Sequence, residues 1–419
     1  MTAAPITAPI TAPTGAPTTA PPPATRRHDI DALRAIAFAA LILYHWGMLY
    51  VAGEDWGWHL KSAYHAEWLQ LPMIAMNRWR MDLIFLISGL SVHFLLRDTR
   101  IGRFIALRSW RLLLPLIFGM WVVVPIQPYA EGVSNGLVQP GFLAFLARYY
   151  TGATWPQGAF AGWEHGFTWN HLWYLAYLWT YTCVFALLLP LLRRLPNPLA
   201  RLRNWHLVIW PAVPLMIATL VLQPHFEDTG DLVHDWYRHA VYFTVFLYGW
   251  WLGTNEGVWN ELARLRRRSL VSAIGLFAFY IACVLALPSE ISDALEPFIW
   301  ILRNLYIWWM LCAILGYART YLNRPFRWLP WATEAVYPWY VLHQSLIIGI
   351  AFVLLPMHLG PIVEPALVLL GTVAGCALLH AIIRRSNLLR PLFGMKWKRR
   401  QASAASMSLA RDSGVSVGA

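Results

Sequence analysis

The chain has 419 residues, of which 58% are hydrophobic and 13% are charged, and its mean hydropathy is +0.46. Soluble domains carry about 25% charged residues, so this composition excludes an ordinary soluble protein and predicts an all-helical, polytopic membrane protein embedded in a lipid bilayer. The net charge of +12 fits membrane topology and attraction to anionic lipids, and it does not indicate a nucleic-acid partner.

The two ends of the chain differ from its apolar centre. Residues 1–25 form a Thr/Ala/Pro repeat without charged side chains, which predicts a disordered tail. This tail lacks the basic start and the apolar core of a signal peptide, so we expect the first spanning helix to direct membrane insertion. We assign 26–390 to one integral membrane domain, and 391–419 to a cytoplasmic tail that is first basic and then disordered.

Ten apolar segments are long enough to cross a hydrocarbon core of about 30 Å at about 1.5 Å per helical residue. Their approximate bounds are 30–50, 79–96, 110–127, 170–192, 206–222, 237–254, 269–287, 298–318, 334–355 and 363–383. With the N-terminus inside, 27 of the 33 Lys and Arg residues fall in inner segments, whereas the outer loops hold only Lys61 and Arg148. The other four, Arg78, Arg80, Arg238 and Arg303, lie at outer borders or within spans. The positive-inside rule therefore predicts that both termini are cytoplasmic.

The first span, DIDALRAIAFAALILYHWGMLY, holds a cation and a titratable imidazole. Helical steps of about 100° place Arg34 and His45 on one face, roughly 16 Å apart along the axis. This arrangement suggests a polar pathway. For Arg34 alone, a side chain that reaches the lipid headgroups is the favoured alternative. His45 could equally be a buried core histidine, but it then needs a polar partner, because an unpaired polar group in hydrocarbon costs several kcal/mol.

The second and third spans add further polar groups. Asp82 lies near the outer end of the second span, where the Ser88-Gly89 pair that follows predicts close helix packing. Arg108 and Arg111 are spaced i, i+3 at the cytoplasmic entry of the third span. Inner loops are commonly rich in Arg, but two guanidiniums on one face near Arg34 could also hold a phosphate-bearing ligand.

The outer side carries an aromatic loop and two histidines. The loop at about 128–169 contains Glu164 and leads into the run GAFAGWEHGFTWNHLWYL, whose aromatics suit either sugar rings or anchoring at the membrane interface. His171 opens the fourth span, two residues before Trp173. His343 lies near the middle of the ninth span, where we expect an internal polar partner. Each of the four cysteines lies in an apolar segment, so we expect neither a disulfide nor a metal site.

Five motifs, in this order, resemble the membrane-bound acyltransferase-3 family from about Asp29 to Arg385. They are IDALRAIAFAALILYH, MDLIFLISGL, RSWR at 108–111, HLWYL at 171–175 and YPWYVLHQ at 337–344. The resemblance implies about ten helices in a bacterial inner membrane. It also implies transfer of an acyl group, usually from cytoplasmic acyl-coenzyme A, to a glycan hydroxyl on the periplasmic or cell-surface side.

Two details refine this resemblance. HLWYL and MDLIFLISGL are similar to the branch that modifies periplasmic glucans, often with succinyl groups, although other sugar O-acyltransferases, including acetyl-transferring ones, are similar too. Many members carry a Glu shortly after the fourth-span His-x-Trp, whereas Tyr177, Leu178 and Trp179 stand here. We see no fused hydrolase-like domain, so we expect the chain to complete transfer itself or to pass the acyl group to a separate protein.

Together, these observations predict a mechanism. The phosphates of acyl-coenzyme A, the donor substrate, bind Arg34, Arg108 and Arg111. His45 is the general base. The remaining candidates are Asp82 or Glu164 to orient His45, His171 and Trp173 on the acceptor side, and His343 at the substrate.

We expect no permanently bound cofactor, and the sequence leaves a homodimer open. The alternative function is a transporter or exporter of a glycan or an organic anion, because intramembrane Arg and His also line substrate paths. No inverted repeat is evident in the sequence, which disfavours that alternative.

Overall fold

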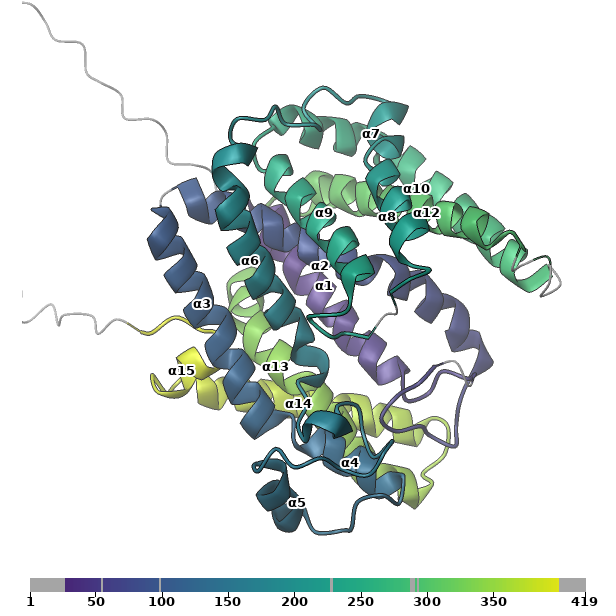
Figure 1. Cartoon of the computed structure of the whole chain (residues 1–419), viewed down its shortest axis with the longest axis vertical. Coiled ribbons are helices and arrows are strands. Elements are labelled where there is room, and N and C mark those ends of the chain that lie inside the picture. Colours follow the sequence, from purple (N-terminus) through teal and green to yellow (C-terminus); the bar gives the residue numbers. More distant parts are fainter. Residues whose placement is uncertain are drawn as a thin grey trace, which may run out of the picture.

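The computed structural model describes residues 27–53, 56–97, 99–226, 229–286, 291 and 294–398. The tails predicted at 1–25 and after 398 lie outside these residues. Within them, the regular structure is helical (Figure 1), and nine helical segments are long and apolar enough to cross a membrane. This confirms the predicted all-helical, polytopic fold.

Each of the nine segments overlaps one predicted span, although the segments at 67–97 and 256–286 begin more than ten residues before the predicted starts. They are α1 (His28–Gly47), η1 with α2 (Glu67–Arg97), α3 with α4 (Ile101–Ser134), η4 with α6 (Asn170–Leu192), α7 with α8 (Trp205–Leu222), α10 (Glu256–Ala286), α12 (Glu296–Tyr321), α13 with η5 (Leu329–Met357) and α14 (Val363–Ile383). Within the composite segments, the α-helices are α2 (Gln70–Arg97), α3 (Ile101–Phe118), α4 (Ile126–Ser134), α6 (Trp173–Leu192), α7 (Trp205–Ile209), α8 (Ala212–Leu222) and α13 (Leu329–Leu354).

The remaining predicted span, 237–254, corresponds to a shorter helix, α9 (Trp236–Leu252). Its 17 residues extend about 26 Å at the usual helical rise, slightly less than a hydrocarbon core of about 30 Å. The described residues therefore contain nine full-length candidates, and α9 packs among them as a tenth, shorter helix against α2 and α8.

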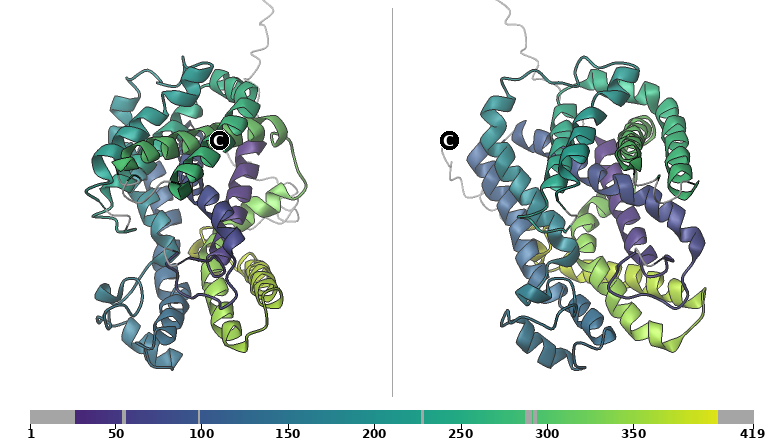
Figure 2. Two further views of the ribbon diagram at one scale, coloured as in Figure 1. Left: turned by 90° about the vertical axis from the view of Figure 1, so that its right-hand side faces the viewer. Right: turned by 45° about the vertical axis from the view of Figure 1, so that its right-hand side comes forward.

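Helices α1 and α2 lie in the middle of the molecule, with α3 and α6 on one side and α10 and α12 on the other (Figure 1). Helix α1 packs against both α2 and α13, and α13 packs against α14 and α4. The two further views keep α13 and α14 beside the lower half of α1 (Figure 2). The polar residues of α1, α2, α6 and α13 are thereby brought to a shared interior.

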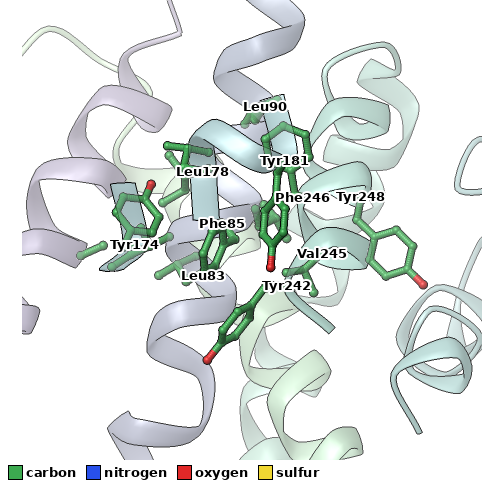
Figure 3. Close-up of a cluster of buried hydrophobic side chains, with 14 of the residues drawn as sticks. Leu83, Phe85, Leu90, Tyr174, Leu178, Tyr181, Tyr242, Val245, Phe246 and Tyr248 are labelled. Atoms are coloured by element: carbon green, nitrogen blue, oxygen red, sulfur yellow. The ribbon is translucent and has the colours of Figure 1, made fainter. Parts of the chain in front are cut away.

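Two glycines allow α2 and α9 to touch. A Cβ atom at Gly89 would overlap the carbonyl oxygen of Phe246, and one at Gly249 would overlap that of Leu86. The close packing predicted for the Ser88-Gly89 pair is therefore confirmed. Next to this contact, Phe85 stacks on Tyr242 with ring centroids 4.7 Å apart, within the buried cluster of Figure 3.

The third span bends instead of running straight. Helix α3 continues into a π-helical turn, η2 (Gly119–Val123), before α4 begins. A Cβ atom at Gly119 would overlap the side chain of Leu172, so the glycine lets the η4 turn (Asn170–Leu172) approach the bend. The bend carries Gln127 into the interior, where it is fully buried.

The helical body extends beyond residue 390, although the sequence analysis assigned the residues from 391 onward to a cytoplasmic tail. The short helix α15 (Leu389–Leu392) lies against α3. Arg390 is ion-paired with Glu334 at 3.1 Å, and the rings of Phe393 and Phe118 are 5.3 Å apart. The chain therefore remains part of the helical body as far as Met395, which is buried.

The outer loop forms a small core of its own. Helix α5 (Phe142–Tyr149) packs its aromatic face against Trp155 and Phe160, both of which are buried. Burial raises the pKa of Tyr149 to about 12, so its hydroxyl keeps its proton and can donate to the carbonyl oxygens of Met120 and Thr168, each at 3.2 Å. Trp155 and Phe160 therefore pack inside the loop. This differs from the two roles considered for the loop aromatics, binding of sugar rings and anchoring at the membrane interface.

Candidate functional site

A cavity of about 550 Å³ opens between α1, α2, α3, α6 and α13. It lies at the end of the bundle where the Arg-rich inner loops are predicted. Five arginines and one carboxylate line it: Arg27, Arg34, Arg97, Arg108, Arg111 and Asp31. The three arginines expected to bind phosphate are therefore brought together, although they come from two helices.

These arginines differ in how far the protein satisfies them. Arg34 is hydrogen-bonded to Ser91 and lies 3.8 Å from the carboxylate of Asp31. Arg111 donates a long 3.4 Å bond to the carbonyl oxygen of Gly394. Among the described residues, Nε and Nη2 of Arg108 are buried and have no hydrogen-bond partner. Buried polar groups are normally paired, so Arg108 presents unused donors that an anion could occupy.

His45 and His343 form a direct pair deeper in the bundle. Nδ1 of His45 lies 2.8 Å from Nε2 of His343, and Nδ1 of His343 lies 2.8 Å from the carbonyl oxygen of Tyr340. A carbonyl oxygen can only accept, so Nδ1 of His343 carries its proton and, in the neutral ring, Nε2 is the acceptor. Nδ1 of His45 must then donate to it, which leaves Nε2 of His45 with a lone pair that no hydrogen bond within the described part of the chain uses.

A small pocket of about 40 Å³ borders His45. Its wall includes His45, Arg80, His171 and Trp173. Two of the residues expected on the acceptor side, His171 and Trp173, therefore do lie beside His45.

Aromatic side chains separate this pocket from the large cavity. Phe38, Tyr174 and Tyr340 border both spaces. The Phe38 and Tyr340 rings meet edge to face at 5.4 Å, and those of Tyr174 and Tyr340 meet in the same way at 5.8 Å. The arginine cavity and the histidine pocket are thus adjacent compartments with a thin shared wall.

His171 is held by hydrogen bonds on both ring nitrogens. Its Nε2 lies 3.2 Å from the carbonyl oxygen of Val341, and its Nδ1 lies 3.2 Å from Nε2 of Gln127. Gln127 also donates to Ser345 at 2.7 Å and accepts a 3.0 Å bond from Gln344. In this arrangement, His171 positions neighbours and has no free nitrogen for proton transfer.

This network continues toward the predicted outer surface. Gln344 lies 3.2 Å from Nε2 of His59, whose Nδ1 is paired with the carboxylate of Glu131. The chain of polar contacts thus runs from a buried histidine of the pocket wall to an acid of α4. A polar path in an otherwise apolar bundle is costly unless its members are satisfied, and here each is hydrogen-bonded.

The structure does not bring Asp82 or Glu164 to His45. Asp82 is two positions from Arg80 on α2, about 200° around the helix, and it interacts electrostatically with Arg238 and Arg303. Glu164 is exposed on η3 (Trp163–His165) in the outer loop. The polar partner that Nδ1 of His45 has in the structure is His343.

Sequence reasoning missed several residues of this site. The sequence analysis did not identify Arg80, Gln127, His59 or Tyr340 as site residues, although all four line the pocket or belong to its hydrogen-bond network. An Arg and a Gln within predicted spans were signals that could have been used, because such groups at membrane depth are rare and need partners.

Comparison with known proteins identifies the class. The profile of the acyltransferase 3 family, described as an acyltransferase domain, matches residues 27–381, which contain every residue lining the cavity and the pocket. Comparison with curated proteins and with solved structures gives no significant match. The match favours an enzyme over the transporter considered above. The chain therefore belongs to the acyltransferase 3 family and is a multi-pass membrane enzyme that transfers acyl groups.

Proposed function

We propose that this enzyme takes an acyl group from cytoplasmic acyl-coenzyme A and transfers it to a hydroxyl of a glycan on the far side of a bacterial inner membrane. The observation that carries the proposal is the adjacency of two compartments along α1. One is rich in arginine and contains Arg34; the other contains His45 with a free Nε2 lone pair.

The arginine cavity suits the phosphates of the donor. Arg34, Arg108 and Arg111 present guanidinium donors to one space, and Arg108 has two donors without protein partners in the described residues. Guanidinium groups bind phosphate oxygens through paired, charge-assisted hydrogen bonds. A cavity of about 550 Å³ accommodates part of a coenzyme A molecule, and the remainder would extend toward the cytoplasm.

The thioester would then reach the histidine pocket. Arg34 and His45 are eleven residues apart on α1, which is roughly 16 Å along the helix, a length that an extended pantetheine arm can span. Phe38, Tyr174 and Tyr340 stand between the two spaces, so the arm must displace at least one of these rings. Until it does, the rings keep water in the cavity away from His45.

The chemistry follows from the tautomer of His45. Nε2 takes the proton of the acceptor hydroxyl as its oxygen attacks the thioester carbonyl carbon, while Nδ1–H stays bonded to His343. The carbon–sulfur bond then breaks, and the coenzyme A thiolate takes the proton from His45. His343 holds the ring in place and supplies an acceptor for the imidazolium that forms between these steps.

The proposal also includes the route of the acceptor glycan and the identity of the acyl group. The glycan would approach through the side bordered by Trp173 and the His59–Gln344–Gln127 network. The similarity of HLWYL and MDLIFLISGL to the glucan-modifying branch favours a periplasmic glucan, with succinyl or acetyl as the transferred group.

The test uses purified protein in nanodiscs with acyl-coenzyme A labelled in the acyl group and an extract of envelope glycans from a strain lacking the enzyme. Transfer of label to glycan by wild type, and its loss by about 10²- to 10⁴-fold in His45→Ala, is the expected result. Mass spectrometry of the labelled product identifies the acceptor. Movement of glycan into sealed proteoliposomes, assayed in parallel, without a covalent product, or full activity of His45→Ala in nanodiscs, would contradict the proposal.

A further inference from the structure

Arg80 of α2 is a buried cation beside His45, and no carboxylate in the described part of the chain forms an ion pair with it. Its side chain is only 7% exposed, and it interacts electrostatically with His45. Among the described residues, its Nε and Nη1 are buried and have no hydrogen-bond partner. Arginine is rarely buried unless it is paired. These unpaired donors therefore suggest that Arg80 binds a group that is absent from the protein itself.

The position of the guanidinium shows what it can do. Its carbon lies 3.5 Å from the centroid of the Tyr44 ring, so one face of the group is held by a cation–π contact. The N–H bonds of a guanidinium lie in its plane, and stacking leaves them free. Arg80 also lines the 40 Å³ pocket that contains His45, His171 and Trp173. Tyr44 therefore holds the cation at the pocket wall through its ring and its hydroxyl, while Nε and Nη1 keep no partner among the described residues.

We propose that Arg80 is a catalytic residue that binds the carbonyl oxygen of the acyl thioester, an inference that rests on the function proposed above. When the acceptor oxygen attacks the carbonyl carbon, the carbonyl π electrons move to oxygen, and the N–H groups of Arg80 stabilise the resulting oxyanion. Collapse of this intermediate re-forms the C=O bond and expels the coenzyme A thiolate. His45 moves the proton, and Arg80 moves none.

The size of the pocket favours this role over binding of an acyl tail. A space of about 40 Å³ holds a carbonyl group or one to two waters, each of which takes roughly 30 Å³ of liquid volume. A four-carbon succinyl chain would need a larger space, even after a ring of the wall has moved to admit the pantetheine arm. We therefore assign the cation to the thioester carbonyl and not to a distal carboxylate, and the comparison of donors below tests this assignment.

Kinetics of Arg80 variants test the assignment. Arg80→Ala and Arg80→Lys are compared with wild type in nanodiscs, using succinyl- and butyryl-coenzyme A, which share the thioester carbonyl and differ in the terminal carboxylate. We expect kcat to fall by about 10²- to 10³-fold in Arg80→Ala with every donor that wild type accepts. Binding of a coenzyme A thioether, which lacks the thioester carbonyl, should be unchanged, and Arg80→Lys should recover part of the rate.

Two further measurements separate catalysis from a structural role. Added guanidinium ion should restore part of the activity of Arg80→Ala, which it would not do for a misfolded protein. Tyr44→Phe keeps the ring beneath the guanidinium and should retain most of the activity. A loss confined to the succinyl donor would overturn the assignment in favour of carboxylate recognition, and so would an unchanged kcat. Absence of acyl transfer by wild type itself would instead refute the function proposed above.

Discussion

His45 and His343 are 298 positions apart in the sequence, yet their imidazole planes are parallel to within 4° and their nearest ring nitrogens are 2.8 Å apart. The carbonyl oxygen of Tyr340, 2.8 Å from Nδ1 of His343, determines the direction of this hydrogen bond. In this hydrogen bond, His45 is therefore the donor and His343 is the acceptor. In the proposed mechanism, this order presents Nε2 of His45 as the base, much as a carboxylate orients the histidine of a hydrolase triad.

The first prediction concerns His343. His343→Ala should remove the acceptor that holds His45, and we expect kcat for acyl transfer to fall by about 10- to 100-fold, the range seen when an outer partner of a functional histidine is lost. Binding of a coenzyme A thioether should stay unchanged, because His343 does not line the arginine cavity. His380→Ala is the matched control, since His380 is equally buried but lines neither space. Equal loss in both variants would point to a general packing effect.

A second prediction separates donor binding from chemistry. Arg108→Ala removes donors that have no partner in the described protein. A charge-assisted hydrogen bond contributes about 1.5–3 kcal/mol, so the dissociation constant for a coenzyme A thioether should rise about 10- to 150-fold. Arg108→Lys should recover only part of this, because an ammonium lacks the planar fork. Calorimetric titration of detergent-solubilised protein measures both values.

The control for this titration is Arg103→Ala. Arg103 lies on the same helix, is exposed and does not line the cavity. Its loss should change affinity only through screened, long-range electrostatics. If Arg103→Ala weakens binding as much as Arg108→Ala does, then general positive charge holds the donor, and the specific phosphate site is refuted.

Topology is a third prediction. Gly102, in the Arg-rich loop region at the start of α3, should be cytoplasmic, and Ala161, in the outer loop, should be periplasmic, because the Lys and Arg bias requires it. Both positions are exposed, and a Cβ atom at Gly102 meets nothing within 4 Å. Cysteine introduced at Ala161 should react with a membrane-impermeant maleimide on intact cells with a permeable outer membrane.

Cysteine at Gly102 should react only after the inner membrane is opened. The unmodified chain is the background control, since its native cysteines are buried or partly buried. Labelling of Gly102→Cys on sealed cells would place the arginine cavity outside, where cytoplasmic acyl-coenzyme A could not reach it.

The contact between α2 and α9 provides a stability prediction. Gly89→Ala would place a methyl group against the carbonyl of Phe246, which forces the two helices apart. Overpacking of this kind costs about 1–3 kcal/mol, so the midpoint of thermal unfolding in detergent should fall. Gly275→Ala on α10 is the matched control, because a Cβ atom there meets nothing within 4 Å. It should leave the midpoint unchanged or raise it slightly, as helix propensity predicts. A wild-type midpoint for Gly89→Ala would mean that the helices are less closely packed.

Much of the fold follows from the amino-acid sequence alone. Apolar runs of the required length identify the spans, because a backbone in hydrocarbon must satisfy its hydrogen bonds within a helix. Among the described residues, the run at 237–254 is the predicted span whose helical segment falls short of a full crossing, since α9 lies between the N-cap Asp235 and the C-cap Gly253. Periodicity likewise determined that Arg34 and His45 share a face, because that relation depends only on the helix of which both are part.

The composition of the site was decided by tertiary structure. Arg34 and Arg108 lie on different helices and meet only because α1 and α3 border the same cavity. The sequence could predict that His45 and His343 each need a polar partner, but not that each satisfies the other. A buried polar group needs a hydrogen-bond partner, because leaving it unpaired is costly. The sequence of one helix shows that need, whereas the partner that meets it depends on how the helices pack. The sequence analysis likewise proposed Asp82 as a residue that orients His45. In the structure, the rotation of α2 about its axis places Arg80 at the pocket and Asp82 near Arg238 and Arg303.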